Sequence, residues 1–173
     1  MLTVTEIGTI HVAFAVAAMA SGAVVLTKPK GTRFHRRTGR VYALSMVALN
    51  VTALMIYRLF GHFGPFHVLA LVSLISVVLG VIPVFLRRPK DRWLDVHYGF
   101  ITGSYLGLIA AFAAEIAVRV PAIRPRSGAA FAVVVIGASL LICVLGGYLI
   151  ARGKRTTLAR FTTGRFRAAA AAR

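Results

Sequence analysis

Five stretches of about twenty apolar residues follow one another along the chain, and each is long enough to form a helix that crosses a membrane. A hydrocarbon core about 30 Å thick needs roughly 20 helical residues per crossing. Few or no charged residues lie inside these stretches, which cover residues 7–27, 41–60, 66–86, 97–118 and 128–151. The pattern predicts an all-α integral membrane helical bundle with about five transmembrane helices.

Composition supports the same fold class, because 58% of the 173 residues are hydrophobic. A soluble domain of this size needs more polar residues to cover its surface. The connections between the apolar stretches are short, so little chain is left for a separate soluble catalytic domain. We therefore expect a single transmembrane helical domain over residues 1–151, followed by a basic tail over residues 152–173.

The formal net charge of +17 raises the question of a nucleic-acid partner, but the distribution of basic residues indicates membrane topology instead. Seventeen Lys and Arg residues lie in the first connection, the third connection and the tail, all on one side if the helices alternate. The positive-inside rule then places the N-terminus outside and the C-terminus in the cytoplasm. We expect a multi-pass protein of the bacterial inner membrane, with anionic lipid headgroups as partners of the basic loops and no nucleic acid.

Four histidines lie at or near the ends of four different apolar stretches. In the predicted topology they form two layers, with His11 and His67 on the outer side and His35 and His97 on the cytoplasmic side. Two imidazoles from facing helices at similar depth are what a bis-histidine b-type haem requires. The pattern favours haem b, or a transition metal, and an electron-transfer role. The sequence leaves open whether His35 lies in the second helix or in a solvated loop.

Other polar residues along the same helices fit a different class of function. Tyr42 continues the helical stripe of His35, and Tyr105 lies roughly in line with His97. Glu115 is an acid inside the fourth stretch, four residues before Arg119, which is the spacing of a helical ion pair. With the histidines, these residues fit the polar network of a non-catalytic accessory subunit or small transporter, with a protein partner or a second copy of the chain.

The only cysteine, Cys143, lies inside the fifth stretch. The chain therefore has no intramolecular disulfide and no motif for covalent haem attachment. We expect Cys143 to be a small buried packing residue. No Gly-rich phosphate loop or HExxH motif is present, so the sequence identifies no catalytic residue and leaves open whether the protein is an enzyme.

Segments around the four histidines also carry a family resemblance. The most specific is HRRTGRVY over residues 35–42, and the others are TIH over 9–11, FHVLALVSL over 66–74, HYGF over 97–100 and SYLGL over 104–108. From about residue 9 to 119 the chain resembles the bacterial membrane-protein family known as domain of unknown function 2306. The resemblance implies a small multispan membrane protein with histidine at those four positions, and it implies no reaction.

Overall fold

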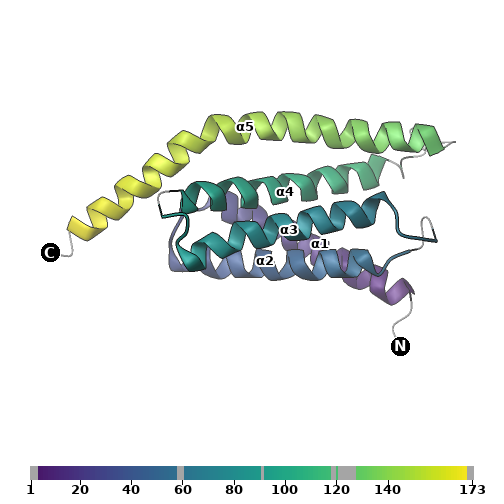
Figure 1. The fold of residues 1–173 in the computed structure, drawn as a ribbon, viewed down its shortest axis with the longest axis horizontal. Coiled ribbons are helices and arrows are strands. Elements are labelled where there is room, and N and C mark those ends of the chain that lie inside the picture. The colour runs from purple at the N-terminus through teal and green to yellow at the C-terminus, as the bar shows by residue number, and fades with distance from the viewer. Residues whose placement is uncertain (1–3, 58–60, 91, 118–119, 121–127, 171–173) are drawn as a thin grey trace. The chain divides into compact units, whose positions relative to one another are not determined.

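The computed structural model describes residues 4–57, 61–90, 92–117, 120 and 128–170, and nearly all of them lie in five α-helices (Figure 1). The helices are α1 (Val4–Thr27), α2 (Arg33–Leu54), α3 (Pro65–Leu86), α4 (Trp93–Ala117) and α5 (Gly128–Ala170). The described ranges contain no strand. The predicted all-α fold class is confirmed.

Four of these helices are long and apolar enough to cross a membrane, judged over the described residues. They are Glu6–Thr27 in α1, Phe66–Leu86 in α3, Trp93–Ala117 in α4 and Ala129–Ala159 in α5. Their lengths match the thickness of a hydrocarbon core. The prediction of a helical membrane bundle is therefore confirmed, while the orientation of the termini stays a prediction.

Helix α2 is absent from this group, although its 22 residues would extend about 33 Å. Basic residues fill its first two turns, and Ser45 and Asn50 are buried along its inner face. The outer face, by contrast, exposes large apolar side chains: Val41, Leu44, Val47 and Val51. The crossing of α2 stays a prediction. The helix ends at Leu54, before the expected residue 60, and residues 58–60 lie outside the described ranges.

The start of α2 settles the position of His35. Thr32 is the N-cap, and its side-chain hydroxyl accepts a hydrogen bond of 3.0 Å from the backbone N–H of His35. Such a cap satisfies a donor that a helix start otherwise leaves unpaired. His35 therefore lies in the first turn of α2, and not in a loop.

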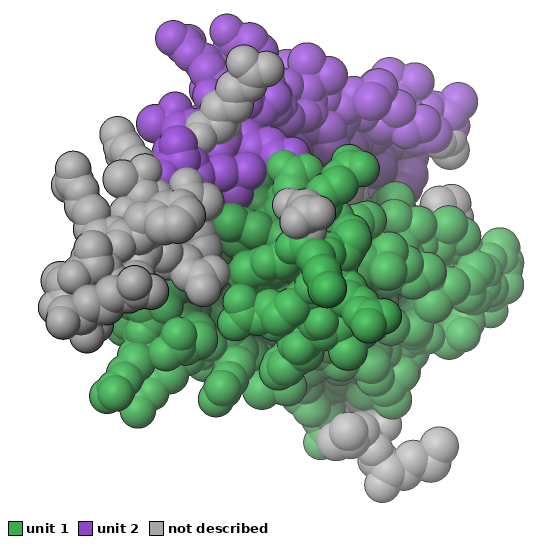
Figure 2. Space-filling model, turned by 60° about the vertical axis from the view of Figure 1, so that its left-hand side comes forward, with its two compact units in different colours: residues 1–104 green, residues 105–173 purple. Residues whose placement is uncertain are grey.

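The chain forms two compact units, residues 1–104 and residues 105–173 (Figure 2). The first unit holds α1, α2, α3 and the first half of α4. Its core includes one fully or nearly fully buried apolar side chain from each helix, namely Ala18, Met46, Val77 and Ile101. A partly buried hydrogen bond also joins α2 to α3, because Asn50 Nδ2 donates to Ser73 Oγ over 3.2 Å. Polar pairs of this kind commonly hold membrane helices together.

The second unit holds the remainder of α4 and all of α5. Gly146 of α5 lies so close to Leu106 of α4 that a Cβ atom at that position would collide with the leucine side chain. Cys143 is exposed, so the expectation that it is buried was wrong, because the apolar part of α5 buries none of its residues inside the protein. Helix α5 also continues through Ala170, so the described part of the basic segment after residue 151 is helical.

Candidate functional site

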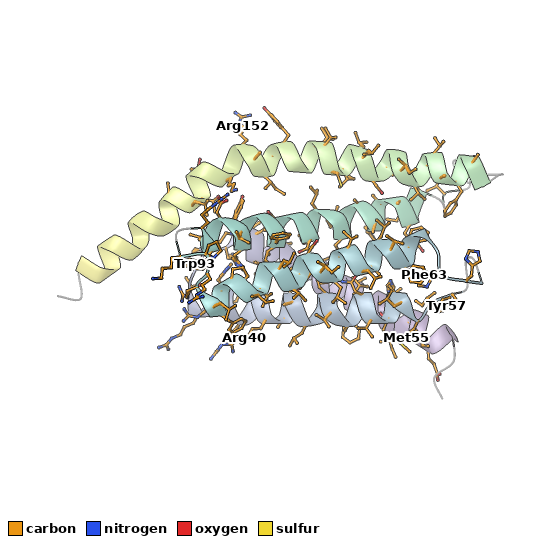
Figure 3. The ribbon with its side chains drawn as sticks, in the orientation of Figure 1. Arg40, Met55, Tyr57, Phe63, Trp93 and Arg152 are labelled. Carbon is orange, nitrogen blue, oxygen red and sulfur yellow. The ribbon has the colours of Figure 1, made fainter. Side chains whose placement is uncertain are left out.

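Two ends of the first unit differ in chemistry. We call the end that carries the α1–α2 and α3–α4 connections the basic end, because exposed arginines lie there: Arg33, Arg36, Arg37 and Arg40 of α2, and Arg87 and Arg88 after α3. We call the opposite end, formed by the α2–α3 connection, the aromatic end. Figure 3 shows Arg40 and Trp93 at the basic end and Tyr57 and Phe63 at the aromatic end. Each end contains two of the four predicted histidines.

His97 lies near the start of α4 at the basic end, and its side chain is tied to α3. Its Nδ1 atom is 2.7 Å from the backbone carbonyl oxygen of Gly80. A carbonyl oxygen only accepts, so Nδ1 carries the proton and Nε2 of the neutral ring keeps its lone pair. Histidines that ligate metals usually donate their other ring N–H in this way, which fixes the ring orientation. His97 thus has the protonation pattern of a ligand.

The tight approach of α3 to α4 explains why glycine supplies this carbonyl. A Cβ atom at position 80 would lie 2.8 Å from Ile101 Cδ1 and 3.2 Å from Phe100 Cβ. Both distances are shorter than ordinary van der Waals contact, so a larger residue would push the helices apart. Gly80 therefore sets the separation across which His97 reaches its acceptor.

His35 lies near His97 and is neutral at physiological pH. Burial, followed by electrostatic repulsion from three basic neighbours, lowers the pKa of the His35 imidazole from 6.5 to about 4. The neighbours are Lys30, His97 and Arg36. Nδ1 of His35 is buried and has no hydrogen-bond partner among the described residues. A neutral imidazole with an unpaired buried nitrogen is able to bind a ligand at that position.

The register of α2 and α4 independently brings these two histidines to the same level. Seven residues separate His35 from Tyr42, and seven separate His97 from Ser104. Tyr42 OH and Ser104 Oγ form a buried hydrogen bond of 2.8 Å. Seven residues are about two helical turns, so each histidine lies on the same helix face as its partner in this bond. Parallel helices joined at Tyr42 and Ser104 therefore place His35 and His97 at the same end.

The depressed pKa of His35 predicts how the stability of the cofactor-free protein depends on pH. Between pH 6.5 and about 4 the unfolded chain binds a proton at His35 and the native protein does not. Stability should therefore fall as the pH is lowered through this interval and should be unaffected by His35 above it. Thermal unfolding in detergent across this range should show a weaker pH dependence for His35→Gln than for the wild type. An unchanged pH dependence in His35→Gln would contradict the assignment, and His62→Gln is the matched control.

At the aromatic end, His11 of α1 contacts α2. Its Nδ1 atom lies 3.1 Å from Thr52 Oγ1. The Thr52 hydroxyl also lies 2.9 Å from the backbone carbonyls of Ala48 and Leu49, to which it donates. Because a hydroxyl has one hydrogen, Thr52 is then able to accept from Nδ1 of His11. The contact fixes the His11 ring against α2.

His67 has the opposite protonation pattern. It lies in the first turn of α3, and its Nδ1 accepts a 3.0 Å hydrogen bond from the backbone N–H of Gly64, the N-cap residue. Because Nδ1 accepts, the proton of the neutral ring is on Nε2. Nε2 is buried and has no hydrogen-bond partner in the described part of the chain. This ring presents a donor at Nε2, where an iron ligand needs a lone pair.

The other predicted polar residues are Tyr42, Tyr105 and Glu115. Tyr42 is engaged with Ser104, while Tyr105 and Glu115 belong to the second unit. Glu115 is exposed, and Arg119, its expected ion-pair partner, lies outside the described residues. No group of three or more His, Cys, Asp or Glu side chains able to hold a metal ion occurs among the residues that were placed. Two histidines are enough only for a cofactor that supplies the other ligands itself, as a porphyrin does.

Two residues that shape the histidines were not predicted from the sequence. Gly80 acts through its backbone carbonyl, which every residue type has. Gly64 acts through its backbone N–H, which every residue type except proline has. A glycine inside an apolar helix does signal a close helix contact. That signal could have directed attention to Gly80, but it could not have identified His97 as the partner.

Comparison with known protein families identifies the family of this chain. The family model described as "Predicted membrane protein (DUF2306)" matches residues 8–150, in agreement with the resemblance seen around the histidines. No curated protein and no solved structure matches the chain.

Proposed function

Because the chain belongs to the DUF2306 family of predicted membrane proteins, we propose its function from its own histidines: it binds haem b between His35 and His97 and carries electrons in the membrane. A bound haem would supply reversible one-electron chemistry. The observation that supports this most directly is the hydrogen bond from His97 Nδ1 to the Gly80 carbonyl, since it leaves Nε2 as the ligand atom.

The protonation states at the basic end suit axial ligation. A haem ligand must be a neutral imidazole. His35 satisfies this condition because its pKa of about 4 keeps it uncharged near pH 7. The two rings come from α2 and α4, which are joined two turns further along by Tyr42 and Ser104. A bundle core that offers facing histidines from two helices is a common cofactor site.

The charge at the basic end also suits haem b, which carries two propionate carboxylates. Exposed arginines surround the first turns of α2, and guanidinium groups form strong paired hydrogen bonds with carboxylates. Arg36 is held near His35 by a 3.2 Å hydrogen bond from Nη1 to the Gly31 carbonyl. In the topology that the positive-inside rule favours, this end faces the cytoplasm, where the same arginines also contact anionic headgroups.

We do not extend the proposal to a second haem between His11 and His67. The proton on His67 Nε2 follows from the Gly64 hydrogen bond and does not suit iron ligation through that atom. The predicted outer pair therefore differs chemically from the pair at the basic end.

A reduced-minus-oxidised visible spectrum of the detergent-purified protein, expressed with sufficient haem, tests the proposal. We expect sharp reduced α and Soret bands at one haem per chain. Two haems per chain would show that His11 and His67 bind one as well. A folded protein without haem would overturn the proposal and favour the accessory-subunit or small-transporter alternative, in which the histidines and Glu115 form a polar network.

A further inference from the structure

The donor of His67 at the aromatic end has no role in the haem proposal. The side chain is 4% exposed, and its Nε2–H points at no acceptor among the described residues. An unpaired buried donor costs free energy, and native structures rarely leave one without a reason. The Gly64 hydrogen bond holds the ring in place, so the ring cannot turn to pair Nε2 without losing that bond.

Two aromatic rings flank His67. The Tyr57 ring centroid lies 4.5 Å from that of His67 with an interplanar angle of 34°, and the Phe63 centroid lies 5.0 Å away with an angle of 29°. Tyr57 is 45% exposed and Phe63 is 52% exposed, and both lie in the α2–α3 connection rather than in a helix. Figure 3 shows them close together at this end. The exposed rings of Tyr57 and Phe63 thus pack against the His67 ring, whose Nε2–H donor is buried.

From this arrangement we infer that the aromatic end binds the ring carbonyl of a quinone, with the His67 Nε2–H as hydrogen-bond donor and Tyr57 and Phe63 as stacking partners. The inference goes beyond the haem proposal and does not depend on it. A ring carbonyl accepts the hydrogen bond that Nε2–H donates, and a flat conjugated ring is able to stack on the exposed faces of Tyr57 and Phe63. Binding pairs the donor that has no acceptor among the described residues.

The chemistry of the enclosure favours a neutral ligand over an anion. His67 offers one neutral N–H between two aromatic faces, and burying an anion there would cost more than one such hydrogen bond returns. Lipid ester carbonyls share the acceptor chemistry of a quinone, but they lack the flat ring that would stack on Tyr57 and Phe63. A lipid acceptor is therefore an outcome that the experiment must distinguish.

The test is titration of the full-length protein, in nanodiscs of quinone-free phosphatidylcholine at pH 8, with decylubiquinone followed by calorimetry. His67→Gln keeps an acceptor for the Gly64 N–H and an amide donor, so it should bind within about threefold of the wild type. His67→Glu keeps the acceptor, since glutamate is common at this capping position, but loses the donor. Loss of one neutral hydrogen bond should weaken binding about tenfold. His62→Gln, in the same connection, is the matched control.

Equal quinone affinity in His67→Glu and the wild type would overturn the inference, and so would the absence of saturable quinone binding. If His67→Glu does not fold, ring-¹⁵N histidine spectra of the wild type decide the question. We expect a protonated Nε2 at His67 whose resonance moves when quinone is added, and a resonance that responds only to a change of lipid would contradict a quinone site. Haem content should be unchanged in His67→Gln, so failure of this inference is distinguishable from failure of the haem proposal.

Discussion

Replacement of His97 with alanine is expected to abolish the low-spin bis-histidine haem spectrum of the purified protein. His97 Nε2 is the ligand atom that the Gly80 hydrogen bond orients, and haem held by one remaining histidine loses its low-spin bis-histidine spectrum. His35→Ala should have the same effect, because both ligands belong to one site. The measurement is the reduced-minus-oxidised spectrum of each variant, normalised to protein, and His62→Ala should retain the wild-type haem content.

Added imidazole separates a lost ligand from a lost fold. The cavity left in His97→Ala should accept free imidazole, which should restore part of the bis-imidazole spectrum if the helices are still in place. Retention of half the wild-type absorbance in both His97→Ala and His35→Ala would show a second haem at His11 and His67. Full retention in both variants would contradict ligation at the basic end.

Much of the helical fold could be predicted because membrane helices are marked by long apolar runs. The sequence also predicted that Tyr42 lies on the same face of its helix as His35. In the structure the Tyr42 hydroxyl on that face forms a hydrogen bond with Ser104 of α4. The true start of α2 follows from an ordinary signal, since Thr32 is a favoured N-cap residue. The continuation of α5 to Ala170 is explained by alanine and arginine, which are strong helix formers even where no apolar run remains.

The chemistry of each histidine could not be predicted, because it depends on backbone groups that the sequence does not distinguish. His97 and His67 are both early residues of apolar helices. One donates to the Gly80 carbonyl, and the other accepts from the Gly64 N–H. Only the packing of α3 against α4 and the geometry of the α2–α3 connection decide which nitrogen carries the proton. The two pairs of histidines, equivalent by spacing, therefore have different capabilities.

Replacement of Gly80 with alanine is expected to weaken haem binding by about 10- to 100-fold, the usual effect of disturbing an outer-shell partner of a metal ligand. The new Cβ would lie 2.8 Å from Ile101 Cδ1 and 3.2 Å from Phe100 Cβ, so the Ile101 side chain must move and the contact between α3 and α4 must open by a few tenths of an ångström. Separation lengthens the 2.7 Å hydrogen bond that holds His97. Haem titration of the cofactor-free protein measures the affinity directly.

The matched control is Gly103→Ala on α4, where an added Cβ meets no atom within 4 Å. Both substitutions gain the helix propensity of alanine, about 1 kcal/mol relative to glycine, so that contribution cancels between the two variants. A fall in haem affinity confined to Gly80→Ala would then report the positioning of His97 rather than a general change in the bundle. Equal haem affinity in the two variants would mean that the Gly80 carbonyl does not orient a haem ligand. The hydrogen bond from His97 to Gly80 would then no longer support haem binding at the basic end.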